Sequence, residues 1–158
     1  KTTGPEIWED TDGKVDAFEP VLVAYGDCLS DIDIQEMIES HRRQQSLATV
    51  AIAHPTGRNE ILALNEQGCY IGTKQGKKQK HSWVNACSMV LEARAFDYLK
   101  ENQENHFALS LMDCLAAHEP VQTYRHEGFW SPVETIRDKT LMENLWAQHK
   151  APWKVWED

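Results

Sequence analysis

An aspartate stands directly after the first apolar run of the chain. Residues 21–25, VLVAY, carry no charge, and Gly26 and Asp27 follow them. In open parallel sheets, ligands bind beyond the carboxyl ends of the strands, and a carboxylate is a hard oxygen ligand suited to Mg²⁺. This stretch favours two interpretations equally: Asp27 holds a metal, or Asp27 or Asp31 caps the helix that follows.

Lysines gather in the segment GTKQGKKQK, at residues 72–80. A glycine-rich turn with a lysine can cradle phosphates. The spacing is wrong for that motif, because three residues separate Gly72 and Gly76 where four are needed, and Lys78 stands where Ser or Thr should meet the metal. We therefore interpret the segment as a solvated basic loop, in which Lys74 alone could contact a phosphate.

A second acid of interest, Glu134, lies at the expected start of a helix, after the aromatic loop GFWSP. Acids are favoured in the first turn of a helix, so a stabilising role is the simpler interpretation and a ligand role the alternative. The tryptophans near the end of the chain are interpreted as packing residues. The seven histidines show no metal-ligand spacing.

Strands and helices alternate along the first third of the chain. The unbroken apolar run at residues 21–25 predicts a fully buried strand of a parallel sheet. Ser30 is predicted to cap a helix that extends to about Gln44. Residues 47–53 form a second buried strand, so the order is strand, helix, strand. The inner face of the helix would carry Ile34, Met37, Ile38 and His41.

The rest of the chain adds a hairpin, further strands and three helices. Strands at 61–64 and 69–71 flank a four-residue loop that ends in Gly68, a hairpin pattern. The pattern as a whole predicts a mixed α/β fold with at least one βαβ unit. Other strands are predicted at 83–91 and 121–125, and helices at 92–102, 107–117 and 134–150. Inward side chains of these helices would include Ala95, Phe96, Leu99, Leu141, Leu145 and Trp146.

The composition is that of an acidic globular protein. At 158 residues the chain is long enough for about one domain. A net charge of −9 and a pI near 5.2 argue against nucleic acid as a partner, since binding it needs a clustered basic face. No apolar stretch approaches the roughly 20 residues of a membrane span, and the start shows no signal-peptide pattern.

The four cysteines are far apart in the sequence and form no C-x-x-C pair. Their spacing therefore predicts neither a structural zinc site nor a disulfide framework. A reducing compartment fits this usage best, and we expect a cytoplasmic protein.

From about Pro20 onward the chain resembles the later part of the glucose-1-phosphate cytidylyltransferases, a family of nucleotide-sugar pyrophosphorylases. The resemblance covers nearly 140 residues in the right order. It is carried by YGDCLSDIDI, SLATVAIAHPTGR, WVNA, MVLEARAFDYL, YRHEGFWSPVETIRDKTLMENLW and the ending KAPWKVWE.

The resemblance implies a reaction and a site. The family transfers the cytidylyl group of CTP to glucose 1-phosphate with Mg²⁺, which gives CDP-glucose and pyrophosphate. By resemblance, Asp27 and Glu134 would bind Mg²⁺, Lys74 would contact phosphate as the catalytic lysine, and Asn85 would contact the sugar. The implied fold is a truncated nucleotide-sugar transferase sheet, Rossmann-like, with flanking helices and a C-terminal helical segment.

The chain departs from the family pattern mainly at this site. Side chains in place of glycine would obstruct the close approach of a ligand, and a longer carboxylate would misplace a metal. The family's N-terminal part, with its glycine-rich nucleotide loop and its first central strand, has no counterpart here. The departures are T-K for E-K at 73–74, Ala86 and Cys87 for two glycines, R-N-E for R-F-G at 58–60, and Glu134 for an aspartate.

Residues 1–18 resemble a different family, the cysteine synthases, just before the phosphate cup of that family. The cup itself does not follow and no cofactor lysine motif is found, so we expect no pyridoxal phosphate. The chain is thus divided into a lead-in segment at 1–18 and a nucleotidyltransferase-like domain at 19–158. A junction near Phe18 indicates a fusion, a rearranged gene or an engineered chain.

The hypothesis that follows is a remnant of a glucose-1-phosphate cytidylyltransferase, inactive as this chain alone. It would bind at most Mg²⁺ and a nucleotide sugar or sugar phosphate. The alternative is a non-catalytic chimeric or engineered structural domain. A third expectation is a homo-oligomer or a partner chain that completes the sheet, because an incomplete sheet leaves an edge open to pairing.

Overall fold

The computed structural model describes residues 20–54, 61–74, 82–101 and 107–157. Eight strands form a six-stranded sheet, in the order β1-β6-β3-β7-β5-β4, and a two-stranded ribbon, β2-β8. The strands are β1 (Val21–Ala24), β2 (Cys28–Ser30), β3 (Ala48–Ala53), β4 (Ile61–Leu64), β5 (Tyr70–Lys74), β6 (Val84–Leu91), β7 (Val121–Arg125) and β8 (Trp130–Pro132). The helices are α2 (Ile34–Gln44), the 3₁₀ helix η1 (Ala93–Glu101), α3 (Phe107–Ala116) and α4 (Ile136–Ala147).

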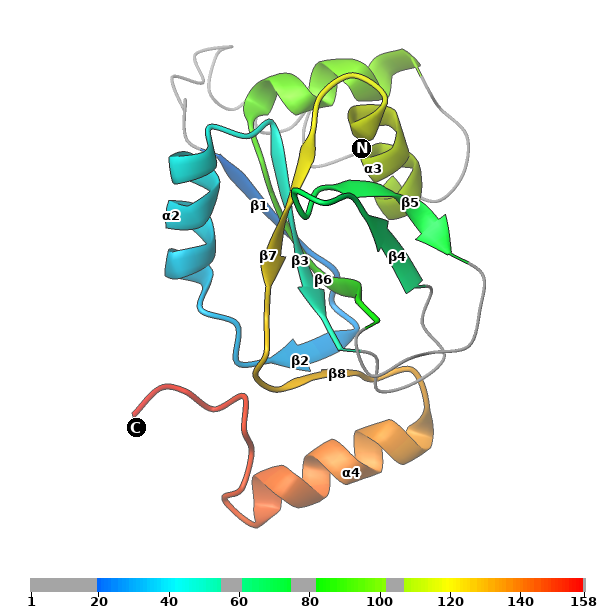
Figure 1. Ribbon diagram of the computed structural model, residues 1–158. Coiled ribbons are helices and arrows are strands. Elements are labelled where there is room, and N and C mark those ends of the chain that lie inside the picture. The colour runs from blue at the N-terminus through cyan, green and yellow to red at the C-terminus, as the bar shows by residue number, and fades with distance from the viewer. Residues whose placement is uncertain (1–19, 55–60, 75–81, 102–106, 158) are drawn as a thin grey trace, which may run out of the picture.

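The large sheet is covered on both faces. All six residues of β3 are buried, and successive side chains of a strand point to opposite faces. Val50 and Ile52 pack in a cluster with η1 and α3, whereas Ala51 and Ala53 pack in a cluster with Met37 of α2. Figure 1 shows α2 beside the sheet and α4 apart from it, next to the β2-β8 ribbon. The predicted mixed α/β fold with flanking helices is confirmed.

The predicted hairpin is confirmed as well. Strand β4 pairs antiparallel with β5, and the Asn65 side chain accepts a hydrogen bond of 2.9 Å from the Cys69 amide. Gly68 has a φ of 83°, a left-handed conformation that glycine adopts at little cost. Of the predicted basic loop, Gly72, Thr73 and Lys74 belong to β5. Its remaining residues, 75–80, lie outside the described ranges, as does the whole lead-in segment, 1–18.

The prediction of a fully buried parallel strand at 21–25 is wrong. Strand β1 lies at the edge of the sheet and pairs antiparallel with β6, its one neighbour among the described strands. Val21 is 41% exposed and Leu22 is 40% exposed. An apolar run fixes the strand conformation but not the number of neighbours, so this pattern could not separate a central strand from an edge strand.

The predicted start of the first helix is also wrong. Ser30 belongs to β2, where it pairs with Trp130, and the helix is capped by Asp33, whose carboxylate accepts a 2.9 Å hydrogen bond from the Glu36 amide. Ser30, Asp31 and Asp33 can each accept a hydrogen bond at the start of a helix, so the sequence did not identify which of them is the cap. On the inner face, Met37 and His41 are buried as predicted, whereas Ile34 is exposed.

The last helix begins later than predicted and buries a different side. Thr135 caps α4 in a reciprocal capping box with Asp138, and the hydrogen bond from the Thr135 hydroxyl lowers the pKa of the Asp138 carboxyl. Leu141 and Trp146, predicted to face inward, are about half exposed, and Met142 is the buried residue of this helix. In the segment predicted as a helix at 92–102, the structure has a 3₁₀ helix, with Ala95 buried as predicted.

None of the helices in the described ranges is long and apolar enough to cross a membrane.

The turn between β7 and β8 is fastened to the end of β2. The Asp31 amide donates to the Phe129 carbonyl over 3.1 Å, and Nε2 of His126 donates to the same carbonyl over 3.0 Å. The Asp31 carboxylate lies 2.9 Å from the same ring nitrogen, although the N–H is directed at the carbonyl. Gly128 lies against this group, because a Cβ there would stand 2.6 Å from Asp31 Oδ1 and 2.8 Å from His126 Cε1.

We predict that Gly128→Ala lowers the free energy of unfolding by about 1–3 kcal/mol, the usual cost of forcing an extra methyl group into a packed site. The midpoint of urea denaturation measures this change. Gly26→Ala is the matched control, since nothing lies within 4 Å of a Cβ at Gly26. Equal midpoints for the two variants would contradict the close packing around Gly128.

Candidate functional site

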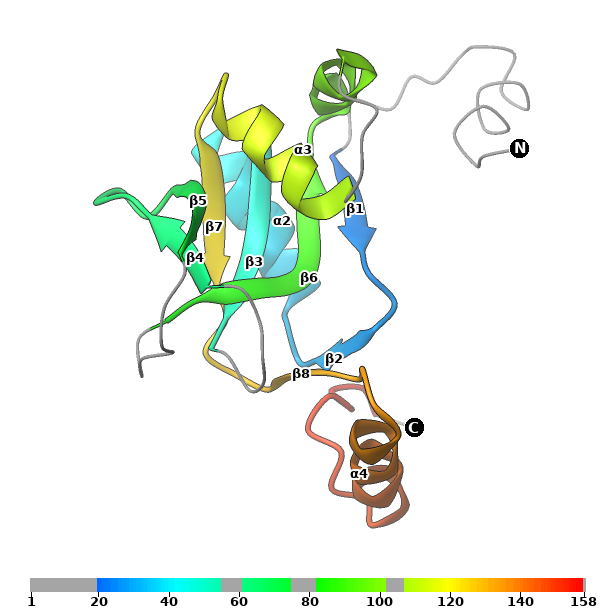
Figure 2. The same ribbon diagram turned by 90° about the vertical axis from the view of Figure 1, so that its right-hand side faces the viewer.

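A bulge in β6 organises the region after β1. Asn85 is paired with Ile52 of β3 and Met89 with Val50, so β6 uses more residues than β3 to cover the same distance. Within the bulge, Cys87 has a φ of 63°, and the Asn85 side-chain oxygen accepts a 2.8 Å hydrogen bond from its amide. Figure 2 shows β6 bending sharply at one end of the sheet.

The bulge holds the turn that carries Asp27. The Tyr25 amide donates to the Cys87 carbonyl over 2.9 Å, which brings the residues after β1 over the bulge. The thiol of Cys28 makes long contacts to two carbonyls, 3.8 Å to Ala86 and 3.9 Å to Tyr25. As a result, one ligand atom each of Asp27, Cys28 and Cys87 lies within 4.8 Å of the other two. The Asp27 side chain is exposed and the two cysteines are partly buried.

The two thiols affect each other's ionisation. The hydrogen bond from Cys87 lowers the pKa of the Cys28 thiol, against an opposing effect of burial, and the indole N–H of Trp130 lowers it further. The same pairing with Cys28, together with burial, raises the pKa of the Cys87 thiol. Burial, with added repulsion from Cys87 and Asp27, raises the pKa of Tyr25 to about 12. Cys28 is therefore the first thiol of the pair to ionise.

The structure brings Asp27 and the Glu134 segment together. Strand β2 pairs with β8, and the Val133 amide then donates to the Asp27 carbonyl over 2.8 Å. Glu134 is the next residue, with an exposed side chain, and its amide donates to the Asp138 carboxylate over 3.3 Å. The two candidate metal ligands, more than a hundred residues apart, thus lie on neighbouring backbone segments.

A pocket of about 410 Å³ lies between the Asp27 turn and α4. Lys139 projects from α4 at this pocket and forms a 3.2 Å ion pair with Glu143, one turn further along. The sequence reasoning missed Lys139, because one lysine on an exposed helix gives no signal of its own. The lining residues are Gly26, Asp27, Cys28, Leu29, Val133, Lys139, Met142 and Glu143.

The other two sequence-predicted residues, Asn85 and Lys74, do not line the pocket at Asp27. Asn85 is half-buried, and besides its bond to Cys87 it donates to the sulfur of Met112 in α3 over 3.6 Å. Lys74 ends β5 and pairs with Ile61 of β4. Three strands, β6, β3 and β7, separate β5 from β1 in the sheet. Asn85 therefore lies in the bulge next to Cys87, with its side chain already engaged, whereas Lys74 lies across the sheet from Asp27.

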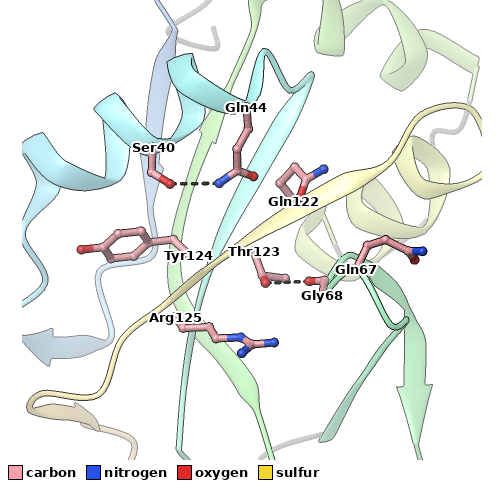
Figure 3. A pocket seen from close by; sticks show the side chains of 8 residues that line it. All are labelled: Ser40, Gln44, Gln67, Gly68, Gln122, Thr123, Tyr124 and Arg125. Carbon is pink, nitrogen blue, oxygen red and sulfur yellow. Dashed lines mark hydrogen bonds between the residues drawn. The ribbon is translucent and has the colours of Figure 1, made fainter.

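A second, polar pocket of about 540 Å³ crosses β7 (Figure 3). Its side chains are partly committed to each other, since Thr123 donates to the Gly68 carbonyl over 2.7 Å and Gln44 donates to Ser40 over 2.9 Å. The guanidinium of Arg125 lies 5.7 Å from the ring centre of Trp83. This pocket shares no residue with the one at Asp27. Its lining residues are Ser40, Gln44, Gln67, Gly68, Gln122, Thr123, Tyr124 and Arg125.

The fold is shared with solved structures of low sequence identity. A Bacillus anthracis protein crystallised with sucrose, provisionally assigned as a glucose-1-phosphate thymidylyltransferase, superposes with a TM-score of 0.68 at 14% identity, over 100% of this chain and 62% of that one. HddC from Yersinia pseudotuberculosis superposes with a TM-score of 0.61 at 15% identity, over 88% of this chain and 60% of its own. At these identities, the likeness establishes the fold alone.

Sequence comparison gives a closer relationship. No protein-family model matches the chain. The glucose-1-phosphate cytidylyltransferase of Salmonella typhi is 34% identical over 140 residues, which is 88% of this chain and 53% of the relative. A Bacillus subtilis protein provisionally assigned the same activity is 28% identical over 141 residues, 87% of this chain and 54% of the relative. The chain is therefore a homologue of the glucose-1-phosphate cytidylyltransferases and spans about half the length of the curated relatives it matches.

Proposed function

We propose that this chain binds a sugar phosphate or nucleotide sugar, together with Mg²⁺, in the pocket beside Asp27, and that it does not transfer a cytidylyl group by itself. The observation that carries the proposal is the 2.8 Å hydrogen bond from the Val133 amide to the Asp27 carbonyl, since it sets two carboxylates, Asp27 and Glu134, on adjacent segments. Both side chains are exposed, so a hydrated Mg²⁺ ion could reach them from solvent.

The residues at this place suit a hard cation and a phosphate. Mg²⁺ in proteins is commonly held by one or two carboxylates, with water and substrate phosphates as its other ligands. Asp27 and Glu134 would hold it here, and the bound ion would supply positive charge to phosphate oxygens. Lys139, at the same pocket, could contact an anionic ligand if it exchanged its 3.2 Å ion pair with Glu143 for that contact. A volume of about 410 Å³ lies within the range of small-molecule sites.

The contacts of Asn85 and the strand position of Lys74 support binding without catalysis. The side chain of Asn85 is engaged by Cys87 and Met112 and would have to release those contacts to meet a sugar. Lys74 lies on β5, which three strands separate from β1, so its place in the sheet does not favour a role in offsetting charge at Asp27. Phosphoryl and nucleotidyl transfer depend on groups held close to the reacting oxygens, and small displacements cost orders of magnitude in rate.

The open edge of β1 supports a further part of the proposal. Among the described strands β1 has β6 as its one neighbour, and its outer residues Val21 and Leu22 are exposed. A second copy of this chain or another partner chain would complete the sheet there. Sedimentation equilibrium should then give a mass above that of one chain, 18.1 kDa. A single species of that mass at working concentration would rule out pairing between chains.

Ligand binding can be measured by thermal unfolding in Mg²⁺ with CDP-glucose or glucose 1-phosphate. A ligand at 100 times its Kd should stabilise the chain by about 2.7 kcal/mol, or roughly 5–10 °C. We predict that Asp27→Asn and Glu134→Gln abolish the part of this shift that requires Mg²⁺, whereas Lys139→Gln reduces it. Glu66→Gln, an exposed acid of the hairpin loop, is the control and should leave the shift unchanged.

A transition that none of these ligands moves would contradict the binding proposal. It would favour the alternative of a non-catalytic structural domain, whether chimeric or engineered, in which the inherited residues only support the fold.

Turnover is the separate test of the second half of the proposal. We predict no CDP-glucose above background when the chain alone is incubated with CTP, glucose 1-phosphate and Mg²⁺, with product followed by chromatography. Product formation that disappears in Asp27→Asn would show that the chain is a complete catalyst and that Asn85 and Lys74 are better placed in solution than in the structure.

A further inference from the structure

We propose that Asp27, Cys28 and Cys87 bind a thiophilic divalent cation, of which Zn²⁺ is the model. Their ligand atoms, two sulfurs and a carboxylate oxygen, lie within 4.8 Å of one another. Across the described ranges, this is the one group of three or more acidic, thiol or imidazole side chains so arranged. The proposal does not depend on nucleotide-sugar binding, although the two sites would compete for Asp27.

The geometry needs little adjustment to become a zinc site. Zinc is tetrahedral with Zn–S distances of about 2.3 Å, which sets its sulfur ligands about 3.8 Å apart. The present limit of 4.8 Å exceeds this value by about 1 Å, and a small rotation of side chains closes the difference. Asp27 is exposed on a turn and free to follow. Three protein ligands leave one position of the tetrahedron for water.

A buried donor beside Cys28 is the second, independent observation. Trp130 is 3% exposed, and its indole N–H has no hydrogen-bond partner of normal geometry. Its neighbour is the sulfur of Cys28, on the strand that pairs with β8. A neutral thiol is a weak acceptor, whereas a metal-bound thiolate is a strong one. Metal binding would therefore replace a weak acceptor for this N–H with a strong one, in the manner of groups that surround metal ligands in proteins.

The third ligand is held in place before the metal arrives. Cys87 is fixed in the β6 bulge by the side chain of Asn85 and by the Tyr25 amide, at 2.8 Å and 2.9 Å. Asn85 is thus a positioning residue for this site. Thiolate sulfur selects Zn²⁺ over Mg²⁺, since soft ligands suit the softer ion.

Binding of the ion is an acid-base event with no change of oxidation state. Each thiol loses one proton to solvent as its sulfur bonds the ion, so two protons are released per Zn²⁺. Two thiolates and one carboxylate then face a charge of +2, which leaves the assembled group with a net charge of −1.

The test is a titration of the reduced full-length chain with Co²⁺, followed by absorption spectroscopy. We expect one equivalent to bind, with a sulfur-to-cobalt charge-transfer band and tetrahedral d–d bands, and complete displacement by Zn²⁺. Cys87→Gly should weaken binding at least tenfold and reduce the charge-transfer band. This variant should still fold, because glycine adopts the φ of 63° at Cys87 more readily than cysteine does.

Two further variants distinguish this site from nonspecific metal binding by thiols. Trp130→Phe removes the N–H donor while keeping the packing and should weaken binding by about tenfold, the lower end for outer partners of a metal site. Cys114→Ser alters a partly buried thiol outside the group and should change nothing. Cobalt bound without the sulfur band, or a band that persists unchanged in Cys87→Gly, would overturn the proposal.

Discussion

The candidate site depends on one irregularity, the bulge of β6 around Cys87. An unbroken β6 would stay in register with β3 and would present alternate side chains to the two cores. Instead, the Asn85 side chain accepts a hydrogen bond from the Cys87 amide, and the Cys87 carbonyl accepts one from the Tyr25 amide. That bond directs the chain after β1 toward β2. Strand β2 pairs with β8, and α4 follows β8 in the chain. The pocket at Asp27 follows from the bulge.

The same bulge gives the site its mixed chemistry. A left-handed backbone costs a residue other than glycine about 1–2 kcal/mol, so the conformation at Cys87 is one that favours glycine. By resemblance, glycine is what the cytidylyltransferases have there. A thiol at this position keeps the turn, adds strain and introduces a sulfur next to Cys28 and Asp27. Asp27, the carboxylate of the proposed Mg²⁺ site, therefore lies beside two sulfurs that are donor atoms suited to a softer metal.

The sequence predicted those features that are determined locally. The six buried residues of β3 and the Asn65-to-Gly68 hairpin follow from short-range patterns, and both were predicted correctly. The edge position of β1 could not be predicted, because it depends on which strands lie beside it. The cysteine spacing pointed away from any metal site, since Cys28 and Cys87 meet only through the β1-to-β6 pairing and the bulge. Of the four tryptophans interpreted as packing residues, Trp130 and Trp153 are buried, whereas Trp146 and Trp156 are about half exposed. The buried indole N–H of Trp130 beside Cys28 could be found only from the structure.

The arrangement of the sheet bears differently on the two parts of the proposed function, cation binding and cytidylyl transfer. Asp27, Glu134 and Lys139 are positioned by short connections: the β1 turn, the β2-β8 ribbon and the first turns of α4. Those elements lie within the described residues, so the proposed cation site would draw its ligands from them and not from the distant strands of the sheet. Transfer chemistry needs charges converging from several strands, and Lys74 lies across the sheet on β5. The proposed function therefore places different demands on the fold: ligand binding would rest on these short connections, whereas transfer would require groups from distant strands.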